Sequence, residues 1–198
     1  MISTFISSVA PAVKGKGSIA DVYSDKTNDN YGIGEGLTFD SDSQYNVAIG
    51  SFALDRNDDG DKNIAIGHES ATNITSGDSN IAIGYRALYA DLTGSYNHAI
   101  GTLALYDCNG GNYNVAFGYE ASANITSGSN NIAIGYRALK TETGSGENIA
   151  IGSQALTAQN GGVGNVGIGN SAGLSNSSAD YNIFIGALAG DAITTGDK

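Results

Sequence analysis

The residues best suited to chemistry lie in segment 55–61, which reads Asp-Arg-Asn-Asp-Asp-Gly-Asp. Oxygen atoms at alternate positions are the ligands that a hard cation such as Ca²⁺ prefers. The candidate metal ligands are Asp55, Asn57, Asp59 and Asp61. The twelfth position of a calcium loop would be a glutamate, but Ile66 stands there. The segment is either a weak metal site or a solvated acidic turn, and no cofactor is expected.

Two histidines and one cysteine are the remaining candidates for catalysis or metal binding. His98 lies in an apolar column and is interpreted as a packed core residue, with metal or anion binding by several copies as the alternative. His68 falls in a turn, and Cys108, also in a turn, is interpreted as incidental rather than nucleophilic. No Ser–His–Asp or Cys–His arrangement can be assembled from these positions, so we expect no enzyme activity.

Several of the 11 tyrosines recur at fixed places in the sequence. One set is Tyr85, Tyr119 and Tyr136, and the other is Tyr45, Tyr96, Tyr113 and Tyr181. Rings on a rigid surface stack on sugars, whereas evenly spaced rings also stack on one another and stabilise a fold. We favour mutual stacking, and we keep the first set as candidate contacts with a host-surface glycan.

These residues belong to a repeat in which an Asn recurs at every seventeenth position and is followed four positions later by a Gly. The pairs are Asn46 and Gly50, Asn63 and Gly67, Asn80 and Gly84, Asn97 and Gly101, Asn114 and Gly118, Asn131 and Gly135, Asn148 and Gly152, Asn165 and Gly169, and Asn182 and Gly186. A fixed period of this kind marks a repeat architecture. Its length suits one coil of a parallel β-solenoid, with two short strands and two turns.

Each coil is numbered from its Asn as position 1, so the first coil begins at Asn46 and the ninth at Asn182. Positions 2 and 4 carry mostly Ile or Val, and position 3 carries Ala in seven coils. Side chains alternate between the two faces of a strand. We predict that the branched face fills the coil and that the Ala/Gly face packs against sister chains. Ala at position 8 predicts the second strand.

Charged residues one coil apart indicate the register of the stack. Glu69 stands one period before Arg86, and Glu120 stands one period before Arg137. In an in-register stack each pair would lie about 5 Å apart. The Asn column is predicted either to form a hydrogen-bond ladder from coil to coil or to bond the turn backbone locally.

The repeat divides the chain into three segments. Residues 46–198 hold nine coils, and residues 30–45 are interpreted as a degenerate capping coil, one position shorter than the others. Residues 1–29 are either a docking arm or a flexible tail. The chain stops as the ninth coil closes, so we expect that another chain covers this end or that Phe184, Gly190 and Asp191 mark an atypical coil that blunts it.

Composition excludes several classes of function. The net charge is −11 with nine basic residues, so no nucleic-acid footprint is expected. No apolar run approaches the roughly 20 residues of a membrane span, so no membrane insertion is expected. The N-terminus lacks the basic region of a secretory signal, which favours synthesis in the cytoplasm.

The motif Asn-(Ile/Val)-Ala-Ile-Gly, followed by Ala at position 8, resembles the head repeat of trimeric autotransporter adhesins and related repeats of bacteriophage tail fibres and spikes. The resemblance covers residues 46–198 and implies a left-handed, homotrimeric parallel β-roll with a rod shape. The usual adhesin coil is shorter. The signal, coiled-coil stalk and membrane barrel of adhesins have no counterpart in this sequence.

We therefore expect an all-β, non-enzymatic virion protein: a trimeric fibre or spike on a phage tail or capsid surface, made in the host cytoplasm. Residues 1–45 would dock on other virion proteins, and the outer turns would contact the host surface. The alternative is the head fragment of an adhesin on a bacterial cell surface. A glycan-degrading spike would need a carboxylate pair across a groove, and an ice-binding solenoid would need a flat Thr ladder.

Overall fold

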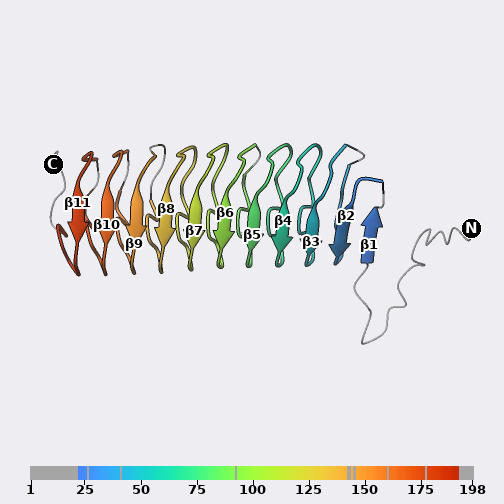
Figure 1. Ribbon diagram of the computed structural model, residues 1–198. Coiled ribbons are helices and arrows are strands. Elements are labelled where there is room, and N and C mark those ends of the chain that lie inside the picture. The colour runs from blue at the N-terminus through green and yellow to red at the C-terminus, as the bar shows by residue number, and fades with distance from the viewer. Residues whose placement is uncertain are drawn as a thin grey trace, which may run out of the picture.

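The computed structural model describes residues 22–25, 27–40, 42–91, 93–141, 144, 146–159, 161–176 and 178–191. These residues form an elongated stack of coils whose strands line up in one eleven-stranded sheet (Figure 1). The strands follow one another in the sheet in the order of the chain. The described part of the chain contains no helix, and hence none long and apolar enough to cross a membrane.

Nine strands of three residues each belong to the repeat. They are β3 (Val47–Ile49), β4 (Ile64–Ile66), β5 (Ile81–Ile83), β6 (His98–Ile100), β7 (Val115–Phe117), β8 (Ile132–Ile134), β9 (Ile149–Ile151), β10 (Val166–Ile168) and β11 (Ile183–Ile185). Neighbouring strands pair in parallel at equivalent positions of their coils, so that Ile64 lies opposite Ile81. The sequence period is therefore the step from one coil to the next, and the predicted parallel β-solenoid of about nine coils is confirmed.

Two further strands lie at the N-terminal end of the stack. β1 (Val22–Asp25) pairs antiparallel with β2 (Asn30–Ile33), which in turn pairs parallel with β3. Tyr31 lies opposite Val47, so the coil that begins at Asn30 keeps the register of the stack although it is one position shorter. Most of the predicted docking arm, residues 1–21, lies outside the described residues.

The predicted second strand in each coil is wrong. Among the described residues, positions 6 to 10 form turns, because positions 7 and 9 adopt left-handed backbone angles. In the third coil, Arg86 has a φ of 51° and Leu88 a φ of 53°. The N–H of Arg86 donates to His68 O in the preceding coil (3.1 Å), and that of Leu88 donates to Ala104 O in the following coil (2.9 Å). This segment therefore bonds both neighbours without extended backbone.

The interior of the coil is lined by small side chains, which reverses the predicted assignment of the two strand faces. Ala82 at position 3 is fully buried, whereas Ile81 and Ile83 on either side point outward and are partly exposed. Ala87 and Leu88 complete the buried layer of this coil. One leucine and two alanines thus fill a narrow coil, and the branched strand residues are left on its outside.

The core keeps its volume by exchange between positions 9 and 12. The second coil has Ala71 at position 9 and a fully buried Ile74 at position 12. The fifth coil has Ser122 and Ile125 at the same two places. Because close packing penalises both voids and overlaps, the small residue and the large one compensate for each other within a coil.

The ninth coil is atypical, as the sequence suggests. Phe184 replaces Ala at position 3 and is 6% exposed. Its ring lies beside Gly173 and Gly190, where an added Cβ would come within 2.6 and 2.2 Å of ring atoms. The ring therefore fills the core at this end, while Ile183 and Ile185 remain exposed on the outside (70% and 68%).

The Asn column does both things that the sequence allows. Asn80 donates its backbone N–H to Oδ1 of Asn63 (2.9 Å), and its Nδ2 donates to Gly94 O within its own coil (2.8 Å). Its Oδ1 accepts the N–H of Asn97 in the next coil (2.8 Å). All nine Asn residues of the column are buried. The column therefore links successive coils through the interior and also binds the turn of each coil by hydrogen bonds.

Candidate functional site

Two groups of aromatic and charged side chains lie on the turns that follow the strands. The first turn cluster is His68, Glu69, Tyr85, Arg86 and Tyr89. The second turn cluster is Tyr119, Glu120, Tyr136, Arg137 and Lys140. They are separated by three coils and occupy equivalent positions of their coils.

Both predicted ion pairs between adjacent coils are present. Arg86 Nε donates to Oε2 of Glu69, and Arg137 Nε donates to Oε2 of Glu120 at 2.7 Å. The hydrogen bond from Arg86 lowers the pKa of Glu69. The pairs confirm the predicted register, and they hold the arginines against the preceding coil.

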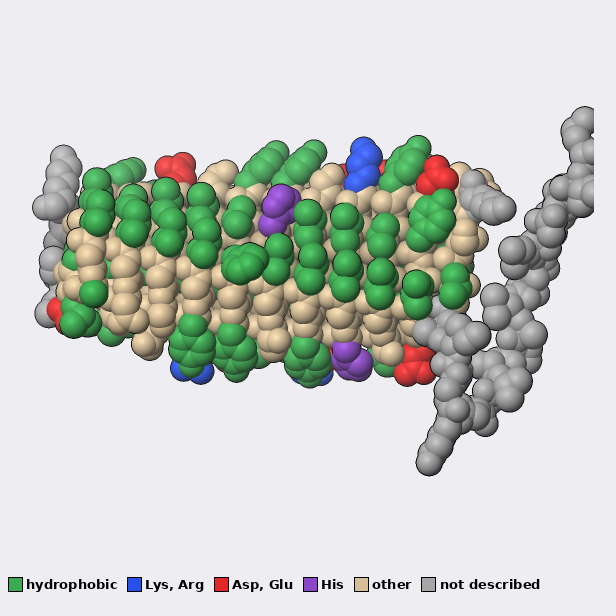
Figure 2. All heavy atoms as spheres, turned by 60° about the horizontal axis from the view of Figure 1, so that its bottom comes forward, with side chains coloured by type: hydrophobic (Ala, Val, Ile, Leu, Met, Phe, Trp, Pro, Cys, Tyr) green, Lys and Arg blue, Asp and Glu red, His purple; other side chains and the backbone are tan. Residues whose placement is uncertain are grey.

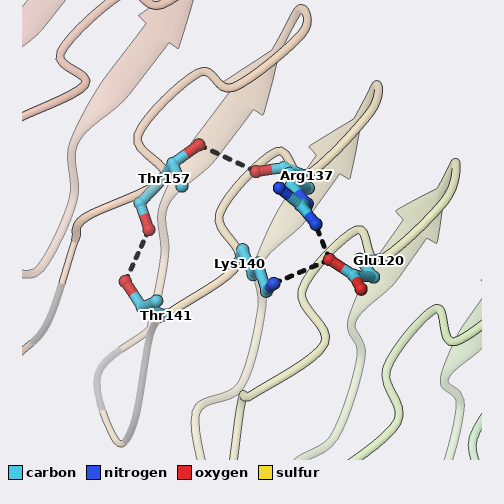
Figure 3. A network of polar contacts seen from close by, with 5 residues as sticks. All are labelled: Glu120, Arg137, Lys140, Thr141 and Thr157. Atoms are coloured by element: carbon cyan, nitrogen blue, oxygen red, sulfur yellow. Dashed lines mark hydrogen bonds and ion pairs between the residues drawn. The ribbon is translucent and has the colours of Figure 1, made fainter.

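The second turn cluster contains a further cation that sequence reasoning missed. Lys140 Nζ also binds Oε2 of Glu120, at 2.7 Å (Figure 3). The pKa of Glu120 is lowered chiefly by this hydrogen bond, and also by those from Arg137 and the Tyr119 hydroxyl. Lys140 follows Arg137 by three positions on the same turn, and this spacing is the signal that would have revealed it.

Threonines fix the backbone around this cluster. Thr157 Oγ1 donates to the carbonyl of Arg137 (2.9 Å), and Thr141 Oγ1 donates to the carbonyl of Thr157 (Figure 3). These bonds join the sixth and seventh coils directly beside the charged side chains. The backbone that carries the cluster is therefore held by hydrogen bonds between coils.

The aromatic rings stack from coil to coil, as predicted. Tyr119 and Tyr136 have ring centroids 5.7 Å apart and planes 11° apart, and His68 and Tyr85 lie 5.8 Å apart with planes at 27°. Each of the three tyrosines is nevertheless exposed (43–44%). Stacking and exposure therefore coexist on these turns.

Two further pairs of tyrosines stack, whereas the exposed Tyr45 and Tyr181 stack on no other ring among the described residues. Tyr96 and Tyr113 stack at 4.9 Å with nearly parallel rings. Tyr89 of the first turn cluster stacks on Tyr106 with ring centroids 5.3 Å apart, a pair that sequence reasoning missed. Their common place at position 10 of adjacent coils is the signal for this pair. The guanidinium of Arg86 lies 5.2 Å from the ring centre of Tyr89, within cation–π range.

The predicted metal ligands in segment 55–61 do not converge. Asn57 is buried in the coil, where its Nδ2 donates to Gly60 O (2.8 Å), while Oδ1 of Asp61 accepts the N–H of Gln44 (2.7 Å). Asp55 is half-buried and Asp59 is exposed. Across the described ranges, no three His, Cys, Asp or Glu side chains gather closely enough to hold a metal ion.

The outward side chains of positions 2 and 4 form a continuous flat surface, here named the apolar face. It consists of Val47, Ile49, Ile64, Ile66, Ile81, Ile83, Ile100, Val115, Phe117, Ile132, Ile134, Ile149, Ile151, Val166, Ile168, Ile183 and Ile185, together with His98. Figure 2 shows it as rows of hydrophobic side chains along the length of the molecule, interrupted by one histidine. The prediction that His98 packs in the core is wrong, because position 2 faces outward and His98 is exposed.

The cysteine lies in the interior next to a buried acid that sequence reasoning missed. Asp91 is fully buried and accepts hydrogen bonds from the N–H of Gly94 (2.7 Å) and Gly110 (3.1 Å) and from Nδ2 of Asn97 (3.1 Å). Burial raises the pKa of Asp91. Burial, and then the charge of Asp91, raise the pKa of Cys108, so its thiolate is disfavoured and the thiol is unreactive.

Comparison with models of protein families, with curated proteins and with solved structures gives no match. Two surfaces of the described residues remain as candidates for function, the apolar face and the turn clusters. The apolar face suits contact with other chains, and the turn clusters suit recognition by a rigid array of rings and charges.

Proposed function

We propose that the chain forms a homotrimeric, left-handed β-solenoid rod that serves as a non-enzymatic structural protein of a virion. It is a fibre or spike on a phage tail or capsid surface, docked through residues 1–45, and its outer turns contribute to host attachment. The observation that carries this proposal is the apolar face, which extends along all nine coils.

The apolar face is too large to remain in water without cost. Complete burial of a Val or Ile side chain is worth roughly 1.5–3 kcal/mol. Ile134 and Ile151 are 38% and 36% exposed, so about a third of this value remains to be gained at each position. Over the 17 apolar residues the gross gain is on the order of 10 kcal/mol per chain, comparable with the whole stability of an ordinary domain. This gain offsets much of the free-energy cost of the translational and rotational freedom that is lost on association.

The assembly therefore uses the opposite strand face from the one that the sequence suggests. The Ala side chains of position 3 are fully buried within each chain and are unavailable to sister chains. Three copies of the branched face around a common axis would cover all three surfaces. The resemblance to trimeric adhesin heads and phage fibres supports three copies rather than two.

The positions of the acidic side chains support a non-enzymatic role. Glu69 and Glu120 are three coils apart, which is roughly 14 Å at the ordinary strand spacing. The two carboxyl groups of glycosidases lie about 5–9.5 Å apart, and one of them has a raised pKa. Both of these glutamates have lowered pKa values instead, so neither is suited to act as a general acid.

The assembly is tested by measuring the mass of the chain in solution by light scattering coupled to size exclusion. We expect a particle of three chains of 20.1 kDa. Ile134→Asp places a charge in the apolar face and is expected to give monomers, whereas Asn170→Asp adds the same charge on an exposed turn and is expected to leave the trimer intact. A wild-type monomer would refute assembly through this face, and a dimer would refute the three-fold symmetry.

The virion assignment is tested by electron microscopy of native particles with a gold-labelled antibody against the chain. Label on a tail or on the capsid surface is the expected result. Label on the envelope of a bacterium, with none on particles, would favour the adhesin-head alternative.

A further inference from the structure

The row of rings at position 6 is interrupted at one place. The second and third coils carry His68 and Tyr85 there, and the fifth and sixth carry Tyr119 and Tyr136. The fourth coil, between them, carries the small residue Thr102. The lower edge of Figure 2 shows large side chains in two groups with a gap between them, which fits this order.

The interruption leaves two ring faces turned toward each other. One face of Tyr85 is covered by His68, and one face of Tyr119 is covered by Tyr136. Because the coils stack along one axis, the other face of each tyrosine is directed toward the fourth coil. The two faces therefore border the space above Thr102 from opposite sides.

Neighbouring charged groups hold the two tyrosines that border this space. Arg86 binds Glu69 in the second coil, and its guanidinium also lies over the ring of Tyr85, 5.2 Å from the ring centre. The Tyr119 hydroxyl is hydrogen-bonded to Glu120, which is itself held by cations of the sixth coil. The wall formed by Tyr119 is thus fixed before binding, which lowers the entropic cost of capturing a ligand.

The width of the space selects the shape of the occupant. Two coil steps at the usual strand spacing place the two rings roughly 9.6 Å apart. A flat ring between them would need two contact distances of about 3.5–4.0 Å each, or roughly 7–8 Å in all. The remaining space of roughly 2 Å suits a puckered ring, whose atoms lie above and below its mean plane, better than a planar one.

We infer that the slot formed by Tyr85, Thr102 and Tyr119 binds one pyranose ring of a glycan. The C–H faces of the sugar lie against the electron-rich ring faces, and the Thr102 hydroxyl, at the base of the slot, donates or accepts one hydrogen bond. Half-buried Leu103 adds an apolar contact beside it. The inference deepens the host-attachment part of the proposed function, and three chains in one rod would present three slots that bind a polysaccharide with avidity.

The test is NMR titration of the full chain with tyrosine rings labelled with ¹³C. The probes are the methyl pyranosides of glucose, galactose, mannose, N-acetylglucosamine and glucuronic acid, the last of which separates acidic from neutral sugars. We expect at least one probe to shift the ring signals of Tyr85 and Tyr119 with a Kd on the order of 1 mM, as befits one small ligand. The signals of the pair Tyr96 and Tyr113 serve as an internal reference and should not move.

Two variants with the same introduced side chain separate the slot from the rest of the surface. Thr102→Tyr completes the row of rings and is expected to weaken binding at least tenfold without lowering the melting temperature, because position 6 accepts Tyr in three other coils. Ser153→Tyr extends the row beyond Tyr136 and should leave binding unchanged. Failure of all five probes to shift Tyr85 and Tyr119, or full binding by Thr102→Tyr, would overturn the inference.

The outcome is separable from that of the proposed assembly. The mass of the same sample is measured alongside the titration. Trimers that bind none of the sugars would remove the slot and leave the rod, whereas monomers that bind through Tyr85 and Tyr119 would remove the assembly and leave the slot.

Discussion

The glycine at position 5 offers a sharp test of how closely the coils approach. Gly135 in the sixth coil has a φ of +133°, a region that side chains rarely adopt. A Cβ added to Gly135 would stand 2.5 Å from the carbonyl oxygen of Gly152 in the next coil. Gly186 in the ninth coil has a similar φ of +122°, but among the described residues nothing lies within 4 Å of its added Cβ. The pair separates backbone strain from contact between coils.

Gly135→Ala is expected to destabilise the chain by both effects. An unfavourable backbone conformation costs about 1–3 kcal/mol. An overlap that the neighbouring backbone must relieve adds about 1–3 kcal/mol. We therefore expect a loss of about 2–6 kcal/mol for Gly135→Ala and of about 1–3 kcal/mol for Gly186→Ala.

The losses are measured by urea denaturation, followed by circular dichroism and by tyrosine fluorescence, since the chain has no Trp. Amide hydrogen exchange then locates the damage, because each coil of a repeat protein is stabilised by its nearest neighbours. The amides of the sixth and seventh coils should lose the most protection in Gly135→Ala. Equal losses in the two variants would refute the argument from close approach, and no loss in either would refute the argument from backbone angle as well.

Three further changes test the polar contacts. Asn80→Ala leaves the carbonyl of Gly94 and the N–H of Asn97 without this partner and should lower the free energy of unfolding, measured in urea, by roughly 2–6 kcal/mol. Asn73→Ala loses one partly exposed hydrogen bond to Tyr89 O and should cost about 1 kcal/mol. Equal losses would contradict the role of the Asn column. Asp91→Asn removes a buried acid whose raised pKa means that wild-type stability falls as pH rises from the ordinary pKa of an aspartate through the folded value. The melting temperature of the wild type should therefore fall relative to that of the variant over this rise in pH, and a constant difference would contradict this. Glu120→Gln should lower the free energy of unfolding by at most about 1 kcal/mol, and by more than Glu69→Gln, because a lysine binds Glu120 in addition to an arginine. Because the pKa of Glu120 is lowered, this loss should be present above the ordinary pKa of the group and disappear as pH falls through its folded value. A loss that persists in acid would contradict the ion-pair explanation.

The stacking register could be predicted from the sequence because it depends on spacing alone. A constant period places Glu69 beside Arg86 and Glu120 beside Arg137, whatever the shape of the coil. The roles of the Asn column were also predictable, since an amide in every coil can bond both the turn and its neighbour.

The direction of the strand faces could not be predicted from alternation, which separates two sets of residues without saying which is inside. The coil has no room for the branched strand residues, because a leucine at position 9, such as Leu88, already fills it. Two signals in the sequence favour the observed arrangement. His98 is tolerated in the branched column, and Ile74 appears at position 12 where Ala71 replaces leucine.

The second strand was predicted wrongly because left-handed backbone angles at non-glycine residues leave little trace in the sequence. Leu88 and Arg86 are good residues for regular structure, yet both have positive φ. The stack imposes these angles, since they allow the segment to bond the coils on both sides. Tertiary context here outweighs local preference.

The recurrence of the turn clusters after three coils makes the length of this protein adjustable only in certain steps. An in-frame duplication of three coils would lengthen the stack by roughly 14 Å, restore every glutamate to an arginine partner, and create one new junction like that above Thr102. Duplication of a single coil would keep the backbone pairing but place acids and rings opposite unrelated side chains. Genetic variants of different length would therefore be expected to differ by whole blocks of three coils, each of which adds one turn cluster.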